Sequence, residues 1–341
     1  MTPISHHLGA ISLGCAQLGN LYRAVSDEDA RATVDAAWEL GIRYFDSAPH
    51  YGLGLSERRL GEALRNRPRD AYVVSTKVGR LLEPVDHDDG LDDDGYVVPA
   101  THRRVFDFSR DGIRRSLTES LGRLGLDRVD IVYLHDPDRH IADVLATGFP
   151  ALAELRSEDV VSAIGAGMND STLLASLVRE TDMDVVMLAG RYTLLEQDSL
   201  DDLMPLCVER RVGVVAAGIF NSGLLAQPQP PAHAKHNYVD APLELVERAR
   251  AIAAICERHG TTLPAAAIAF PGAHPAVVNV CVGARSAAQI ERNVVLHDDV
   301  LPDELWLELV EAGLIREDAP VPTSAAARPR AEASPRQSQD A

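Results

Sequence analysis

Four polar residues stand where short apolar runs end, and their types together could move a proton at a carbon-bound oxygen. Asp46 ends the run RYFD, and Tyr51 follows in SAPHYG. Lys77 ends YVVSTK, and His135 ends DIVYLH. A tyrosine hydroxyl has a pKa of about 10, too high for an efficient base near neutral pH. A nearby lysine ammonium favours the phenolate and lowers that pKa, and an aspartate can supply the counter-charge. Histidine can hydrogen-bond the reacting oxygen, so the set suits proton transfer at an oxygen whose carbon gives or takes a hydride.

Each of these residues also has an ordinary structural interpretation. Asp46 could cap the next turn, Lys77 could be a surface lysine at a strand end, and His135 could be a hydrogen-bonded interior histidine. All four, however, lie at or just past the ends of successive β-like runs. In a barrel of parallel strands such positions converge on one mouth. We therefore interpret them as one catalytic group.

The elements that must position this group alternate along the chain. Amphipathic helical patterns cover residues 27–40, 57–65, 109–124 and 243–258. The β-rich runs cover residues 10–13, 42–45, 72–76, 130–134, 160–164, 184–188, 213–216 and 276–282. This alternation predicts right-handed βαβ units and a parallel sheet. Eight such strands predict an α/β fold of the (β/α)8, or TIM, barrel type, which we expect to be a single domain over residues 1–316.

Two connections are longer than the rest, at residues 79–107 and 221–242. Both follow strand ends, so we expect both to lie over the mouth of the barrel and to shape a substrate site. The first contains the acidic run at 86–94, which we interpret as a solvated loop. Its spacing does not match a calcium loop, so no metal site is predicted. The Ala-, Pro-, Ser- and Arg-rich tail at 317–341 is expected to be disordered.

Composition narrows the class of partner. The formal net charge is −18, which argues against nucleic acid or an anionic membrane as the main partner. The four cysteines have neither disulfide nor metal spacing, which is typical of a reducing compartment. The sequence starts without a signal-peptide pattern and contains no convincing membrane span. These features predict a cytoplasmic protein that acts on a small molecule.

Residues 41–61, GIRYFDSAPHYGLGLSERRLG, together with VSTK and YLHDPD, resemble the motifs of the aldo-keto reductase family. The resemblance extends over roughly residues 8–315. It implies the same (β/α)8 barrel, with Tyr51 as the general acid/base. It further implies that Lys77 and Asp46 tune Tyr51, and that His135 polarises the substrate oxygen.

The end of the chain indicates a cofactor site. VGARS at 282–286 opens a predicted helix, and a helix N-terminus beside glycine can hold a phosphate through its N–H groups. The stretch resembles the family's adenosine-phosphate site, which implies NAD or NADP as cofactor, and the matching positions are Gly283, Arg285, Gln289 and Asn293. Arg285 could pair with a 2′-phosphate, favouring NADP, or stack on adenine with either cofactor; it could also be a surface residue. Arg292 stands where many relatives have Glu. The first strand lacks a following GxGxxG, which argues against a Rossmann site.

Small residues at 216–225, AAGIFNSGLL, would let the backbone approach a ligand closely. In the family this region covers the nicotinamide and pyrophosphate, which makes Gly218, Ser222 and Gly223 candidate pyrophosphate neighbours. Phe220 could cover the nicotinamide ring or belong to the core. Asn169 could hold the nicotinamide amide, although its register is shifted relative to the family's Gly-x-Ser-Asn.

Segments at 106–113, 134–138, 188–197 and 216–225 resemble the D-threo-aldose 1-dehydrogenase (L-fucose dehydrogenase) branch of the family. This resemblance implies oxidation of the C1 hydroxyl of a cyclic aldose to an aldonolactone, with hydride transfer to the nicotinamide. The alternatives are a pyridoxal 4-dehydrogenase, a general aldehyde or ketone reductase, and a non-catalytic nucleotide-sensing barrel. Asn20, His50 and Asn221 are candidate contacts to sugar hydroxyls, and ordinary loop polarity explains each of them equally well.

Overall fold

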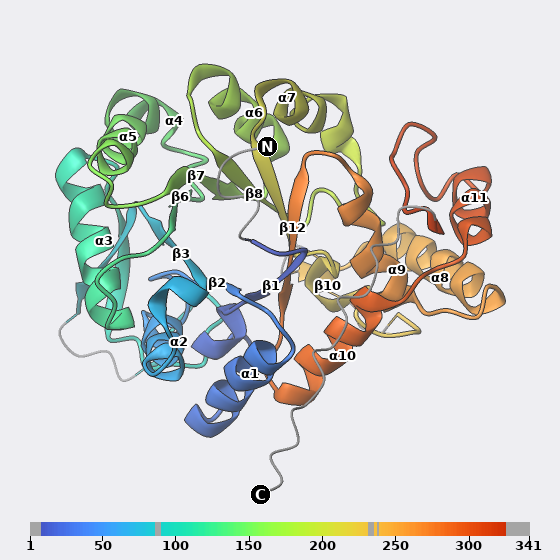
Figure 1. The fold of residues 1–341 in the computed structure, drawn as a ribbon, viewed down its shortest axis with the longest axis horizontal. Coiled ribbons are helices and arrows are strands. Elements are labelled where there is room, and N and C mark those ends of the chain that lie inside the picture. Colours follow the sequence, from blue (N-terminus) through green and yellow to red (C-terminus); the bar gives the residue numbers. More distant parts are fainter. Residues whose placement is uncertain (1–7, 86–89, 231–234, 237–238, 325–341) are drawn as a thin grey trace, which may run out of the picture.

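The computed structural model describes residues 8–85, 90–230, 235–236 and 239–324. Eight parallel strands close into a barrel in the order β1-β12-β9-β8-β7-β6-β3-β2 (Figure 1). They are β1 (Ile11–Gly14), β2 (Tyr44–Asp46), β3 (Val73–Val78), β6 (Ile131–His135), β7 (Ala163–Met168), β8 (Val185–Ala189), β9 (Gly213–Ala217) and β12 (Val277–Gly283). The predicted (β/α)8 barrel is confirmed. Each predicted run overlaps its strand, and the largest displacement is at the fifth, predicted at 160–164.

Helices pack around the outside of the strands, and α8, α9 and α11 lie together at one side of the molecule (Figure 1). Their bounds are α1 (Asp27–Glu39), α2 (Leu55–Leu64), α3 (Arg110–Leu124), α4 (Ile141–Asp143), α5 (Phe149–Ser157), α6 (Ser171–Glu180), α7 (Leu203–Arg210), α8 (Leu243–Arg258), α9 (Leu263–Ala269), α10 (Ala287–Asp298) and α11 (Asp303–Glu311). The main hydrophobic core lies between the barrel and these helices. A second core fills the barrel interior, where Tyr44, Tyr133 and Met187 are buried.

Local hydrogen bonds and a glycine stabilise several helix ends. The Ser26 hydroxyl accepts from the Asp29 backbone N–H at 3.0 Å and caps α1. Gly41 follows α1 with a φ of 86°, a conformation that glycine adopts without strain. At α10 the Ser286 hydroxyl accepts from the Gln289 N–H at 3.4 Å. The Gln289 side chain accepts from the Arg285 N–H, not from Ser286 as in a capping box.

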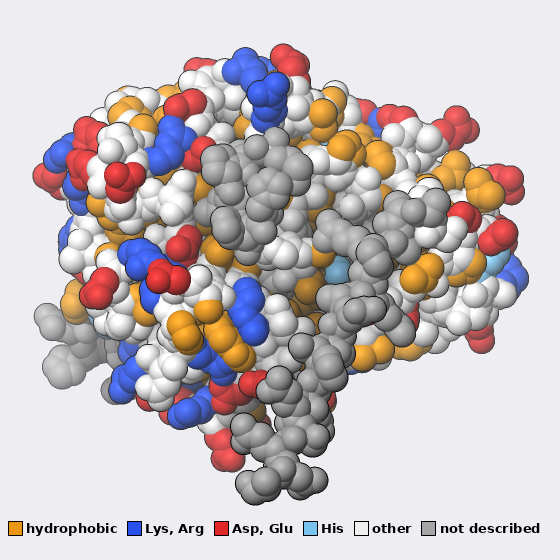
Figure 2. All heavy atoms as spheres, viewed as in Figure 1, with side chains coloured by type: hydrophobic (Ala, Val, Ile, Leu, Met, Phe, Trp, Pro, Cys, Tyr) orange, Lys and Arg blue, Asp and Glu red, His pale blue; other side chains and the backbone are white. Residues whose placement is uncertain are grey.

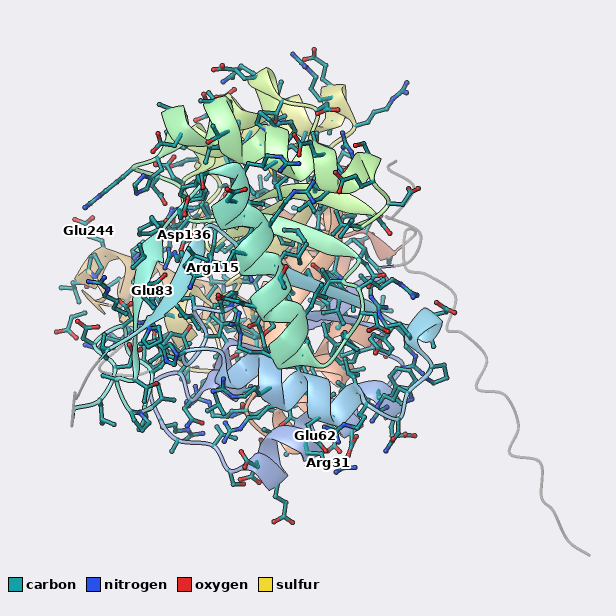
Figure 3. All side chains as sticks on the ribbon, turned by 90° about the vertical axis from the view of Figure 1, so that its left-hand side faces the viewer. Arg31, Glu62, Glu83, Arg115, Asp136 and Glu244 are labelled. Atoms are coloured by element: carbon teal, nitrogen blue, oxygen red, sulfur yellow. The ribbon has the colours of Figure 1, made fainter. Side chains whose placement is uncertain are left out.

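Both long connections contain a hairpin that the sequence pattern did not indicate. β4 (Arg80–Pro84) pairs with β5 (His102–Phe106), and β10 (Lys235–His236) pairs with β11 (Val239–Asp240). The first hairpin, β4–β5, is tied to α3, because the Arg115 guanidinium lies 2.7 Å from the Glu83 carboxylate (Figure 3). The paired strands in the described parts of both connections give the mouth of the barrel structured walls.

The ordered chain continues past the predicted boundary at residue 316. Ala319 is buried against the core, and the Ser324 N–H donates to the Asp303 carboxylate at 2.6 Å. The predicted start of a disordered tail at 317 is therefore too early, because these residues find partners on the barrel and α11. The remainder of that predicted tail, 325–341, lies outside the described residues.

On the face shown in Figure 2, acidic and basic side chains are interspersed. All four cysteines are free and buried. Among the helices in the described part of the chain, none combines the length and the apolar character needed to cross a membrane.

Candidate active site

The barrel brings the four predicted catalytic residues to one mouth. Asp46 is the last residue of β2, Lys77 is near the end of β3, and His135 is the last residue of β6. β2 pairs with β3, and β3 pairs with β6, so these strand ends are neighbours. Tyr51 enters from the loop between β2 and α2.

Lys77 links the group together. Its Nζ donates to Asp46 Oδ2 at 2.6 Å, to the Ser47 carbonyl at 3.0 Å and to Tyr51 Oη at 3.0 Å. The Lys77 and Asp46 side chains are only 2% and 3% exposed. All three ammonium protons therefore have an acceptor, and the one shared with Tyr51 stabilises the phenolate form of that side chain.

A chain of buried hydroxyls supports Asp46 from inside the barrel. Ser75 Oγ donates to Asp46 Oδ1 at 2.6 Å and lies 3.0 Å from Tyr44 Oη, which lies 3.2 Å from Tyr133 Oη. Because Ser75 has one proton and gives it to Asp46, Tyr44 must donate to Ser75. Burial raises the pKa of Tyr44 well above its usual value, so it keeps its proton. The chain holds one carboxylate oxygen of Asp46 and leaves the other for Lys77.

The positions of these hydroxyls can also be recognised in the sequence. Side chains two apart on a strand share a face. Tyr44 stands two before Asp46, Ser75 stands two before Lys77, and Tyr133 stands two before His135. The three hydroxyls therefore form the layer of the barrel interior directly beneath the catalytic layer.

The loop that carries Tyr51 has a constrained path. Gly52, Leu53 and Gly54 all have positive φ angles. A Cβ atom on Gly52 would lie 2.2 Å from the Gly19 carbonyl oxygen, so only glycine fits this close approach. The packing of Gly52 against Gly19, in the loop after β1, therefore fixes the backbone next to Tyr51.

His135 and His50 form the substrate side of the mouth. The His135 ring stands perpendicular to the rings of Tyr51, at 5.9 Å, and His50, at 5.4 Å. Burial, reinforced by the charges of Arg80 and Lys77, holds the pKa of His135 well below its ordinary value. His135 is therefore neutral and can hydrogen-bond a substrate oxygen without adding charge.

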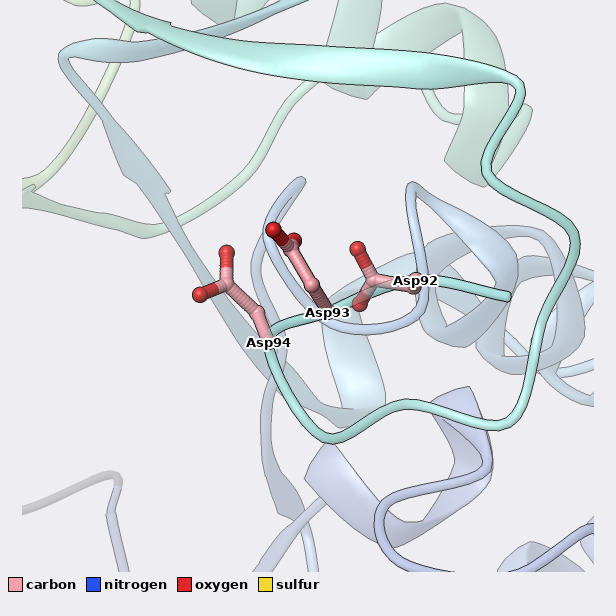
Figure 4. A group of neighbouring side chains, drawn as sticks. All are labelled: Asp92, Asp93 and Asp94. Carbon is pink, nitrogen blue, oxygen red and sulfur yellow. The ribbon is translucent and has the colours of Figure 1, made fainter. Parts of the chain in front are cut away.

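The β4–β5 hairpin and the acidic loop add residues that sequence reasoning missed. The Arg104 guanidinium forms a bidentate ion pair with the Asp92 carboxylate, with N···O distances of 2.6 and 2.9 Å, and lies 2.8 Å from the Asp94 carboxylate. Its Nη2 also donates to the His50 carbonyl at 3.0 Å. The Asp92 side chain is 3% exposed, so this part of the predicted solvated loop is instead a buried structural pair. Figure 4 shows the carboxylates of Asp92, Asp93 and Asp94 on this loop. Residues 86–89 of the acidic run lie outside the described residues.

A cleft of about 510 Å³ opens beside the catalytic group, with Asp46 and Tyr51 at its inner end. It contains all the residues predicted to bind cofactor, namely Asn169, Gly218, Phe220, Ser222, Gly223, Gly283, Arg285, Gln289 and Asn293. A Cβ atom on Gly283 would lie 2.4 Å from the side-chain amide of Gln17, so glycine lets this amide pack closely on the wall of the cleft.

The chemistry of the cleft fits a nicotinamide dinucleotide. Gln17 Oε1 and Asn293 Oδ1 are buried and accept no hydrogen bond from the described residues. Arg23, Arg285 and Arg292 also line the cleft, and none of them pairs with a carboxylate of the described chain. Burial and the charge of Arg23 lower the pKa of Arg285. Free amide acceptors and uncompensated guanidinium groups are suited to an adenine amino group and to phosphates.

The structure engages one of the three predicted substrate contacts, Asn20, within the protein itself. Asn20 Nδ2 donates to the Val97 carbonyl at 3.1 Å, and its Oδ1 accepts from the Val25 N–H and from Arg59. Both ends of this amide are engaged within the protein, so Asn20 has a structural role. Asn221 lines the same cleft as Asp46 and Tyr51, and its Nδ2 donates to the Gly190 carbonyl at 3.3 Å. His50 lies where predicted, beside the catalytic residues.

Comparisons with known proteins agree with this geometry. The model of the aldo/keto reductase family matches residues 10–313. D-threo-aldose 1-dehydrogenase from Pseudomonas sp. is 52% identical over 90% of this chain and 94% of its own. Pyridoxal 4-dehydrogenase from Microbacterium luteolum is 42% identical over 90% of this chain and 94% of its own. The structure of an aldo-keto reductase from Bacillus halodurans in its holo form superposes with a TM-score of 0.70, at 24% identity, over 89% of this chain and 91% of that one. The chain is thus an oxidoreductase that belongs to the aldo/keto reductase family.

Proposed function

We propose that this protein oxidises the C1 hydroxyl of a cyclic aldose of the L-fucose type to the aldonolactone. The observation that carries the proposal is the Tyr51–Lys77–Asp46 chain at the inner end of a cleft with free phosphate-binding groups. The aldose 1-dehydrogenase named above supports the choice of substrate, because it matches nearly the whole chain at 52% identity.

The residues have separate roles in this reaction. Tyr51 takes the proton of the C1 hydroxyl while it is a phenolate, the form that Lys77 Nζ at 3.0 Å stabilises. Asp46 holds the Lys77 ammonium in place, and neutral His135 orients the same hydroxyl. A nicotinamide dinucleotide in the cleft supplies the hydride acceptor. C1 loses a hydride, its hydroxyl oxygen loses the proton to Tyr51, and a C1=O double bond forms.

Of the two cofactors, the cleft favours NADP. Arg23, Arg285 and Arg292 carry three positive charges without a carboxylate partner in the described chain, although acidic residues outnumber basic ones by 51 to 33. NADP differs from NAD by one phosphate, which a guanidinium binds through charge-assisted hydrogen bonds. Replacing Arg285 with Ala should weaken NADP about 10- to 100-fold and NAD much less, a difference of roughly 1.5 to 3 kcal/mol for a charged hydrogen bond. Titration of both cofactors by protein fluorescence measures this ratio, and equal losses for both would contradict the assignment.

The test of function is the absorbance of reduced nicotinamide with L-fucose and either NADP or NAD. Tyr51→Phe should remove turnover and keep cofactor affinity. Tyr192→Phe is the matched control, since Tyr192 Oη is buried away from the site and has no partner in the described chain. Wild-type protein that binds cofactor but oxidises no sugar would refute the proposal. Turnover of pyridoxal in its place would favour the second candidate, which the relative from Microbacterium luteolum supports. Absence of turnover with any carbonyl or alcohol substrate would point to a nucleotide-sensing barrel.

A further inference from the structure

Arg80, the first residue of β4, is held between three other elements at the substrate side of the mouth. Its Nη1 lies 3.4 Å from Nδ1 of His50, in the catalytic loop. Its Nη2 pairs with the carboxylate of Asp136, the residue after β6. Its guanidinium carbon lies 5.0 Å from the ring centre of Phe106 on β5. The side chain is 13% exposed, so Arg80 is fixed by packing as well as by charge.

This contact determines where His50 carries its proton. A guanidinium can only donate hydrogen bonds, so Nδ1 of His50 must accept from Arg80. Burial and the charges of Arg80, Arg104 and Lys77 lower the pKa of His50 to about 2, and its ring is neutral at physiological pH. A neutral imidazole that accepts at Nδ1 has its proton at Nε2.

The His50 ring is also fixed in position from its main chain. Its carbonyl accepts from Arg104, the arginine that Asp92 and Asp94 hold. The ring centre lies 5.3 Å from that of Tyr96, 5.4 Å from that of His135 and 6.1 Å from that of Tyr51. His50 remains partly exposed, so a donor on this ring is available beside the reacting groups.

We propose that Arg80 is a positioning residue that holds His50 as the Nε2–H tautomer, and that His50 then donates a hydrogen bond to the substrate hydroxyl next to the reacting carbon. The second part rests on the proposed function. It predicts a substrate class, namely cyclic sugars with a hydroxyl at C2, because His135 and Tyr51 already engage the oxygen on C1. Pyridoxal has no hydroxyl on the ring carbon that bears its reacting group.

Replacing Arg80 with Met would leave Nδ1 of His50 without its donor and remove a repelling positive charge. The freed ring should then populate both tautomers and take up a proton at a higher pH. Arg80→Lys is the conservative control, because an ammonium can donate to Nδ1 and pair with Asp136. The other titratable and charged groups around His50 are Tyr51, Lys77, Asp92, Asp94, Tyr96, Arg104 and His135.

The first experiment reads the tautomer directly, by nitrogen NMR of the protein labelled at its histidines, without substrate. His50→Gln identifies the His50 signals. In the wild type and in Arg80→Lys we expect His50 to be the Nε2–H tautomer from pH 5 to 8. In Arg80→Met we expect a mixture of both tautomers and a higher pKa for His50. An Nδ1–H tautomer in the wild type, or an unaltered spectrum in Arg80→Met, would overturn the role of Arg80.

The second experiment compares kcat/KM for L-fucose and its 2-deoxy counterpart. The wild type should prefer the C2-hydroxylated sugar about 10-fold or more in kcat/KM. In His50→Phe the ratio of the two kcat/KM values should fall towards 1. His50→Gln keeps an N–H donor and should retain part of the preference. A preference that survives in His50→Phe contradicts the substrate contact. A wild type that oxidises neither sugar contradicts the proposed function, and the NMR spectrum still decides whether Arg80 positions His50.

Discussion

The buried Asp46–Lys77 pair can be tested by a double-mutant cycle that separates stability from chemistry. In Asp46→Asn the Lys77 ammonium keeps the Ser47 carbonyl, Tyr51 Oη and a neutral amide oxygen as acceptors but loses its counter-charge. In Lys77→Met the Asp46 carboxylate keeps only Ser75 among its side-chain partners. Each single change leaves a charge almost wholly excluded from water, whereas the double variant leaves none.

The size of the effect follows from the distance and the burial. At 2.6 Å the attraction between unit charges is about 6 kcal/mol with an effective dielectric constant of 20. Desolvation of both ions offsets most of this gain, so breaking the pair costs about 3 to 5 kcal/mol while replacing both partners is often close to neutral. We expect each single variant to lose about 3 to 5 kcal/mol of unfolding free energy and the double variant no more than about 2 kcal/mol. Turnover should be lost in all variants that lack Lys77, because no cation then faces Tyr51.

Urea unfolding followed by circular dichroism measures these free energies, and sugar oxidation measures turnover on the same samples. The control cycle is Glu62→Gln with Arg65→Met, an exposed pair on one face of α2 and after its end. Its coupling should stay below about 1 kcal/mol. If the loss in the Asp46→Asn/Lys77→Met protein equals the sum of the single losses within about 0.5 kcal/mol, the two charges are not coupled and the reasoning is refuted.

Three further predictions follow from burial and packing. The depressed pKa of His50 means that the unfolded chain binds a proton below about pH 6.5 that the folded chain does not bind, so stability falls with decreasing pH. In urea unfolding from pH 7 to 5 the wild type should lose roughly 2 kcal/mol more than His50→Gln, and parallel stability curves for the two proteins would contradict this. Burial raises the pKa of the thiols of Cys207, Cys256 and Cys281 to about 12, so the native protein should resist iodoacetamide at pH 8. Mass spectrometry should find all four cysteines labelled in denatured protein, and rapid labelling of native protein would contradict the packing. Gly61→Ala should lower the melting temperature, because its Cβ would lie 1.9 Å from the Leu124 carbonyl oxygen, whereas a Cβ at Gly122 on α3 meets open space and Gly122→Ala should raise it. Calorimetry measures both melting temperatures, and equal shifts would refute the α2–α3 packing.

The parts of the site that could be predicted from sequence are those carried by the barrel. Asp46, Lys77 and His135 could be found because parallel strand ends meet at one edge, and the helix-start signal at Ser286 located the arginine-bearing end of the cleft. Arg80 could not be found in this way. Its place depends on the register of a hairpin in which Arg80 opposes Phe106, and the long segment between the two strands leaves that register unspecified by local sequence.

Buried polar partners were the other source of error. Asn20 looked free to bind a ligand, because the sequence does not show that Val97 and Arg59 engage its amide. Asp92 looked solvated, because the sequence does not place Arg104 opposite it. The first contact joins Asn20 to the segment at 79–107, and the second closes within that segment, so local sequence pattern reveals neither.

Two parts of the fold position the site, the barrel strands and the β4–β5 hairpin, and the hairpin acts on His50, the residue before Tyr51. Asp46 and Lys77 stand on barrel strands, so the ion pair that tunes Tyr51 is positioned by the hydrogen-bonded sheet. The groups that shape the substrate side come from the β4–β5 hairpin, and these hold His50 twice, at Nδ1 through Arg80 and at the carbonyl through Arg104. His50 directly precedes Tyr51, so a change in the hairpin reaches the backbone of the base itself. Substrate preference and the position of the base are therefore coupled in this barrel, and hairpin substitutions that alter one should alter the other.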